Sequence, residues 1–228
     1  MNNRRIWFRL GGVLAAAAVC TGGAAVVSDR AQKAKNVQRA FLGAMETQMQ
    51  IGCYPSETGS PADLTERERT ELQTAYTSRV EQYYTEENPC RKRYIALNED
   101  FLTACDSDVE YSESGGVADC RFDSVRLYAD RMTAVVQAWT VVWDKRISGN
   151  PEQGFSVELP VNRDTITATM KKENGVWKLD SIDSQISLSA AVPADDEVCR
   201  ERYPTFETAR QAADSIDDQA YIKEARFA

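Results

Sequence analysis

The first strong pattern along the chain is a run without charged residues from Leu10 to Val27, LGGVLAAAAVCTGGAAVV. As a helix, these 18 residues would extend about 27 Å, close to the thickness of the hydrocarbon core of a bilayer. Arginines precede the run at positions 4, 5 and 9, which favours a cytoplasmic N-terminus. The pattern predicts a transmembrane or signal segment over 1–28, with the remaining chain outside the cytoplasm.

Three fates of this segment remain open. Signal peptidase needs small residues at the −3 and −1 positions, which residues 23–25 and 26–28 provide without a clean A-x-A. Lipidation at Cys20 lacks the preceding large aliphatic residue that it requires, and 3–9 loosely resembles a twin-arginine signal. We prefer an uncleaved single-pass anchor in the cell membrane, and a protein secreted after signal cleavage is the alternative.

After the segment, apolar residues recur at steps of three and four, which predicts three helices over 29–50, 65–87 and 88–105. Thr65 and Glu68 form a capping box at the start of the second, and Asn88 before Pro89 is a start signal for the third. The predicted apolar faces comprise Val37, Phe41, Ala44, Met45 and Met49, then Leu72, Tyr76, Val80 and Tyr83, then Tyr94, Leu97, Phe101 and Cys105.

Beyond a predicted loop at 106–116, alternation and β-branched residues indicate strands. We expect these strands at 120–128, 132–143, 155–159, 165–170 and 176–182, with a polar connection at 144–154 and a tight hairpin turn at 173–175. The strand at 132–143 is nearly apolar throughout, which is typical of a central strand buried on both faces. The strand pattern ends near Asp183, so 186–228 is predicted as a linker followed by a helical or disordered tail that is mobile or loosely docked.

This order of elements predicts an α+β fold in which two to three helices pack on a curved antiparallel sheet. The closing hairpin at 171–182, KKENGVWKLDSI, resembles that of the cystatin-like α+β cone of the nuclear-transport-factor-2-like superfamily. The resemblance implies a domain over 51–185, preceded by the amphipathic helix at 29–50, in which Trp177 packs into the core beside a helix. With its anchor, the layout is similar to actinobacterial mammalian-cell-entry-associated membrane proteins and to periplasmic domains of conjugation-assembly proteins.

The amino-acid composition excludes several classes of function. The chain has 35 acidic and 27 basic residues and a net charge of −8, which argues against nucleic acid as a partner. It contains no histidine, so the usual zinc sites and the Ser-His-Asp and Cys-His mechanisms are excluded. We therefore predict no metal, no cofactor and no catalytic residue.

Five cysteines follow the N-terminal segment: Cys53, Cys90, Cys105, Cys120 and Cys199. In an exported domain they are expected to form disulfides, and the odd number leaves one over. Sequence does not determine connectivity; the pairing we expect is Cys53 with Cys90 and Cys105 with Cys120.

Aromatic residues supply the candidates for a ligand pocket: Trp139, Trp143, Trp177, Tyr94 and Tyr128. Filling of the core explains the tryptophans equally well. Superfamily members resembling ketosteroid isomerase use Asp and Tyr inside the cone, which implies Asp164, Tyr94 and Tyr128 as candidates here.

The sequence thus predicts a membrane-anchored, extracytoplasmic and non-enzymatic module that binds protein partners in a cell-envelope assembly. The alternative is a domain that binds a small apolar ligand or catalyses isomerase-like proton transfer in the cavity of the cone. Nothing in the sequence indicates an oligomeric state.

Overall fold

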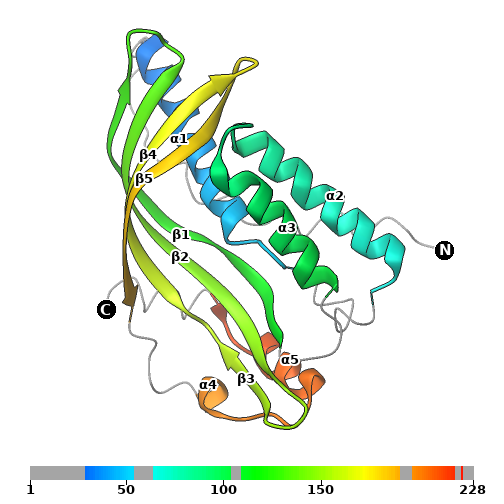
Figure 1. The fold of residues 1–228 in the computed structure, drawn as a ribbon. Coiled ribbons are helices and arrows are strands. Elements are labelled where there is room, and N and C mark those ends of the chain that lie inside the picture. Colours follow the sequence, from blue (N-terminus) through cyan, green and yellow to red (C-terminus); the bar gives the residue numbers. More distant parts are fainter. Residues whose placement is uncertain (1–28, 54–63, 104–108, 191–196, 219–221, 223–228) are drawn as a thin grey trace, which may run out of the picture.

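The computed structural model describes residues 29–53, 64–103, 109–190, 197–218 and 222 (Figure 1). The predicted membrane segment at 1–28 lies outside this part of the chain. Among the described helices, none combines the length and the apolar character that crossing a bilayer requires.

Three helices form one layer: α1 (Asp29–Gln48), α2 (Glu66–Tyr83) and α3 (Pro89–Thr103). Their positions confirm the helices predicted from apolar spacing and capping residues. The Thr65 hydroxyl accepts a hydrogen bond from the Glu68 amide (3.3 Å), and the Glu68 carboxylate accepts one from the Thr65 amide (2.9 Å). The Asn88 side chain similarly accepts a bond from the Cys90 amide at 2.8 Å, which satisfies a free donor in the first turn of α3.

The second layer is a curved, open antiparallel sheet of β1 (Val109–Leu127), β2 (Thr133–Asn150), β3 (Gly154–Glu158), β4 (Val161–Glu173) and β5 (Val176–Ala190). Its order is β1-β2-β4-β5, and the short β3 pairs with the far end of β2. The α+β class and the helices packed on a curved antiparallel sheet are as predicted. Four of the strands are longer than the sequence indicated, because pairing with β2 and β4 continues through segments of weak β propensity.

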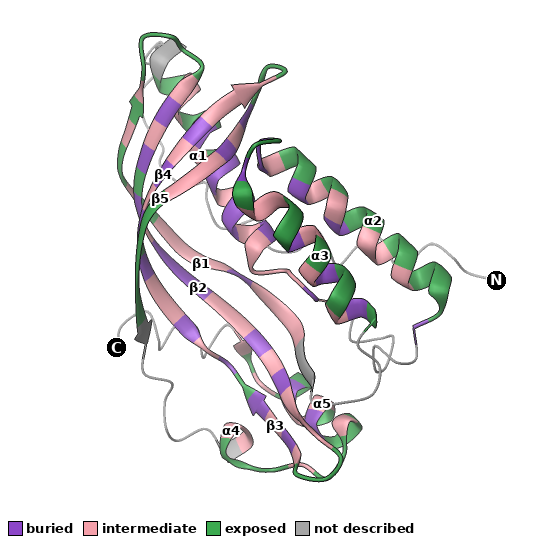
Figure 2. Cartoon of the chain, viewed as in Figure 1, coloured by how far each residue is buried: buried purple, intermediate pink, exposed green. Residues whose placement is uncertain are grey.

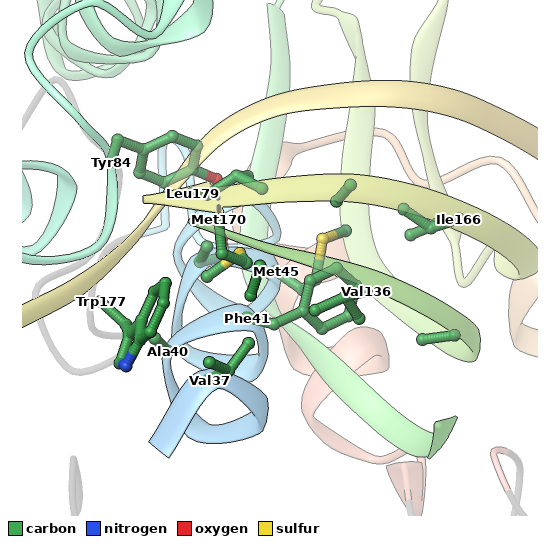
Figure 3. Close-up of a cluster of buried hydrophobic side chains, with 14 of the residues drawn as sticks. Val37, Ala40, Phe41, Met45, Tyr84, Val136, Ile166, Met170, Trp177 and Leu179 are labelled. Carbon is green, nitrogen blue, oxygen red and sulfur yellow. Dashed lines mark hydrogen bonds between the residues drawn. The ribbon is translucent and has the colours of Figure 1, made fainter. Parts of the chain in front are cut away.

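The main core lies between the helices and the sheet (Figure 3). Val37, Phe41 and Met45 of α1 are fully buried against Val136 of β2, Ile166 and Met170 of β4 and Leu179 of β5. Two tyrosines tie the helices together: the Tyr84 hydroxyl donates to the Ala44 carbonyl at 2.7 Å and the Tyr76 hydroxyl to the Thr47 carbonyl at 3.3 Å.

The opposite face of the sheet is called the outward face below, and the described residues cover it only at one end. There α4 (Glu197–Arg200) and α5 (Phe206–Asp214) lie beside β3 and the end of β2. Phe155 and Tyr203 exchange two backbone hydrogen bonds of 2.8 Å, and Ala209 and Ala213 of α5 are fully buried.

For residues 186–190 and 197–218, this arrangement corrects the predicted mobility, although the helical alternative for the tail holds at α4 and α5. Strand β5 continues to Ala190, and α5 packs small side chains onto the sheet.

The burial of β2 also differs from the prediction that this strand is buried on both faces throughout. In its first half Gln137 is exposed, whereas Val141, Lys145 and Ile147 of its second half are buried on the outward face, under other parts of the chain (Figure 2). The strand is therefore buried on both faces only in its second half.

Candidate interaction surface

The five aromatic residues predicted to line a pocket do not come together. Tyr94 and Trp177 belong to the core between helices and sheet, where Trp177 lies beside Val37 and Ala40. Tyr94 packs edge to face on Tyr84, with ring centroids 5.5 Å apart. Their burial explains these two residues as core side chains.

The remaining three lie elsewhere. Trp139 and Trp143 are half-buried beside the apolar cluster formed by Val141, Leu159 and Val161 on the outward face. Tyr128 is exposed at the turn between β1 and β2. The candidates are thus divided among two faces of the sheet and one hairpin turn.

The expected disulfide between Cys53 and Cys90 is absent, since both thiols are free. The Gly52 amide donates to the Asn98 side chain (2.9 Å), which places Cys53 beside the C-terminal half of α3. Cys90 lies in the first turn of α3, two helical turns or about 12 Å away. Cys105 lies outside the described residues, so its expected pairing with Cys120 stays a prediction.

Two of these thiols, Cys53 and Cys120, are also poor nucleophiles. Burial raises the pKa of Cys53 to about 12, with the Ser112 hydroxyl 3.5 Å from its sulfur. Burial likewise raises the pKa of Cys120 to about 12. Both thiols are protonated at neutral pH, which makes them unreactive.

A buried polar pair lies on the helix-facing side of the sheet. Thr140 and Asp164 are register partners in β2 and β4, and both are buried. The Gln185 amide donates to one Asp164 oxygen at 3.1 Å, but neither the other Asp164 oxygen nor the Thr140 hydroxyl has a hydrogen-bond partner among the described residues. The strand expected at 165–170 left Asp164 just outside it, whereas Asp164 lies within β4.

The most exposed apolar side chains of the described residues belong to β5. Ile186 and Leu188 are 61% and 65% exposed and point to the outward face, because they pair in register with Thr165 and Arg163. All side chains from Asp183 to Leu188 are exposed (Figure 2). We call residues 183–188 the distal β5 edge.

The backbone N–H and C=O groups of the distal β5 edge are also available for pairing with another strand. Strand β5 is the last strand of the sheet, and its first half is bridged by Tyr84, whose neighbour Thr85 donates to the Leu179 carbonyl at 3.0 Å. No described segment pairs with its outer edge beyond that bridge. An uncovered edge carrying apolar side chains is unusual, because it invites another chain to pair with it.

The outward face beside this edge carries further binding groups. Ile186 pairs with Thr165, Thr165 pairs with Trp139 and Trp139 with Arg121, so these four side chains form one row across the sheet. The Arg121 guanidinium lies 5.3 Å from the centre of the Trp139 ring, which is a cation–π arrangement. The sequence did not predict this row, because its members come from four strands. The alternation of polar and apolar residues in SQISLS at 184–189 was a pattern that could have indicated a strand with Ile186 and Leu188 on one face.

Where α5 covers the outward face, it encloses a charged cluster. The Lys145 ammonium lies 3.1 Å from Asp218 and 3.9 Å from Glu113, and it donates to the Ala213 carbonyl at 3.2 Å. Burial, followed by the charges of Asp214 and Asp218, raises the pKa of Glu113 to about 7, although Lys145 acts in the opposite direction. The cluster joins α5 to the sheet. None of the described side chains form a group that could hold a metal ion.

Comparison with known proteins gives little further information. The sequence matches no family model and no curated relative. Among solved structures, the crystal structure of the intermembrane space region of the chloroplast protein ARC6 is similar with a TM-score of 0.40 and 12% identity, over 68% of this chain and 96% of that chain.

Proposed function

We propose that this protein is a membrane-anchored, extracytoplasmic domain of the nuclear-transport-factor-2-like kind that binds an extended segment of another cell-envelope protein along its distal β5 edge. The observation that carries the proposal is the exposure of Ile186 and Leu188 on a strand with an unpaired outer edge. The resemblance of the 171–182 hairpin and the uncharged run at 10–27 support the rest of the assignment.

The chemistry of the edge suits strand addition. A partner strand would pair with the free backbone groups, and its alternate side chains would pack on Ile186 and Leu188. Full burial of an exposed Ile or Leu contributes about 1.5–3 kcal/mol each, and the neighbouring Arg121–Trp139 stack adds groups that are enriched in binding hot spots. The distal β5 edge and the outward face beside it thus offer both backbone and side-chain groups for recognition.

The test is a double variant, Ile186→Asp with Leu188→Asp, in the full-length chain expressed in its native membrane. We expect loss of the partners that a photo-reactive residue at position 187 otherwise crosslinks, with unchanged protein abundance, because both side chains are exposed. Ala75→Asp, on the exposed surface of α2, is the matched control and retains the crosslinks. Identical crosslinks in the double variant and the control would contradict the proposal.

The second candidate is a small-ligand domain, favoured by the buried and incompletely bonded Thr140–Asp164 pair. A ligand hydroxyl would satisfy both oxygens, which otherwise remain without partners at a cost in free energy. Asp164→Asn separates the two candidates: it leaves the crosslinks at position 187 unchanged under the first, and it removes a co-purifying ligand detected by native mass spectrometry under the second.

A further inference from the structure

One end of the domain is defined by the direction of α1. Glu46 of α1 accepts a hydrogen bond from the Val117 amide of β1 (3.1 Å), and the ring of Phe41, further back along the helix, lies 5.8 Å from that of Phe122, further along the strand. The helix therefore runs antiparallel to β1. Its first turns lie beside the turn that joins β1 to β2, as Figure 1 shows.

The second hairpin turn lies at the same end. Thr133 at the start of β2 pairs with Lys171 near the end of β4, and Lys172 pairs with Trp177. Both turns carry exposed apolar side chains: Tyr128 is 48% exposed, Met132 47% and Val176 52%. Three large apolar groups thus project from the end at which α1 begins.

This end is basic although the protein is acidic. Segments 29–39, 126–133 and 171–178 together contain nine Lys and Arg and three Asp and Glu, whereas the whole chain has a net charge of −8. One of the acids, Asp130, is engaged within its own turn, where it accepts bonds from the Met132 and Thr133 amides at 2.9 and 3.0 Å. Arg126 and Arg131 are exposed beside it.

The chain leaves no linker between this end and the predicted anchor. The uncharged run ends at Val27, and α1 begins at Asp29. Val37 is already buried in the core, and the eight helical residues before it span only about 12 Å. An anchor in the bilayer would therefore hold both hairpin turns within reach of the lipid headgroups.

We propose that the domain rests on the bilayer through these turns, with Tyr128, Met132 and Val176 inserted among the headgroups and Arg126 and Arg131 bound to acidic lipids. Aromatic and apolar tips flanked by arginines suit the membrane interface, where rings sit at headgroup depth and basic side chains bind anionic lipids. This inference rests on the membrane anchoring in the proposed function. It fixes the orientation of the domain and leaves the distal β5 edge facing away from the lipid.

The test uses the full-length chain in nanodiscs of phosphatidylcholine, with and without phosphatidylglycerol. Photo-reactive benzoylphenylalanine at position 132 or 176 is expected to form lipid adducts, detected by mass spectrometry, and the same group at position 188 is the control without adducts. Removal of one charge, by Arg126→Gln or Arg131→Gln, lowers the adduct yield at position 132 by about fivefold in the discs with phosphatidylglycerol.

Alkaline carbonate extraction of native membranes tests the membrane anchoring in the proposed function separately from the lipid contact inferred here. A chain that is extracted lacks the anchor, and that result overturns both proposals. A chain that stays in the membrane but forms no adducts at positions 132 and 176, or as many at position 188, overturns the lipid contact alone.

Discussion

The two faces of the sheet are stabilised in different ways. The helix-facing side is closed by three helices over an apolar core that includes Phe41, Met45 and Met170, all fully buried. Among the described residues, the outward face is covered only at the end where α5 lies over Lys145 and Ile147, and it is open near Ile186 and Leu188. One face thus carries the main core, while the other is open for contacts and is closed at one end by apolar packing together with a charged cluster.

This difference predicts which substitutions the fold tolerates. Apolar burial does not depend on pH, whereas a buried ion cluster depends on the protonation of each member. We therefore expect substitutions on the helix-facing side to unfold the domain and changes on the outward face to act locally.

The largest effect is expected for Phe41→Ala on the helix-facing side. The substitution removes a fully buried ring that packs on Phe122, so the free energy of unfolding should fall by about 3–5 kcal/mol. Leu188→Ala is the matched change on the open face and should cost little, because that side chain is 65% exposed. Denaturant unfolding of the two variants measures the contrast, and equal losses would show that the faces do not differ.

A smaller and more local effect is expected for Lys145→Ala. The change leaves the buried Glu113 carboxylate and the partly exposed Asp218 carboxylate without their cation, which costs about 3 kcal/mol and is relieved when α5 separates from the sheet. Hydrogen exchange should therefore accelerate in residues 206–214 while α1 to α3 stay protected. Glu113→Gln and Asp218→Asn, added to Lys145→Ala, should restore much of the protection. Uniform loss of protection along the chain would contradict a local role.

The smallest effect is a dependence on pH. Burial holds the pKa of Glu113 at about 7, above its ordinary value of 4.5, so the folded state binds this proton more tightly than the unfolded chain. The contribution is fully present below pH 4.5 and is lost as the pH rises through 7. We expect the wild type to lose about 2 kcal/mol of unfolding free energy between pH 5 and pH 8, and Glu113→Gln to lose less. Parallel pH profiles for the two proteins would exclude Glu113 as the source.

The helices and the last hairpin were predictable because their signals are local. Thr65 and Glu68 lie in one turn, and the tight turn requires only Asn174 and Gly175, which adopt φ values of 50° and 84°. Glycine and asparagine are the residues that accept such angles most readily. No distant residue is needed to identify either feature.

The longer strands and the outward face were not predictable in this way. Segment 109–116 contains two serines and two glycines, and it is a strand because β2 pairs along its length. Lys145 lies in the predicted polar connection at 144–154, but α5 buries it from 68 residues further along the chain. Its partner Asp218 lies further away still, so the spacing of residues near Lys145 does not reveal the contact.

Helix α5 follows all five strands in chain order, and this order has a consequence for biosynthesis. Strands β1 to β5 are complete before residues 206–214 leave the ribosome, so Ile147, Phe155 and Val157 stay exposed until α5 packs on them. During that interval the outward face presents an apolar patch beside a solvated Lys145, which favours aggregation. A nascent chain halted before residue 206 would therefore keep this patch exposed.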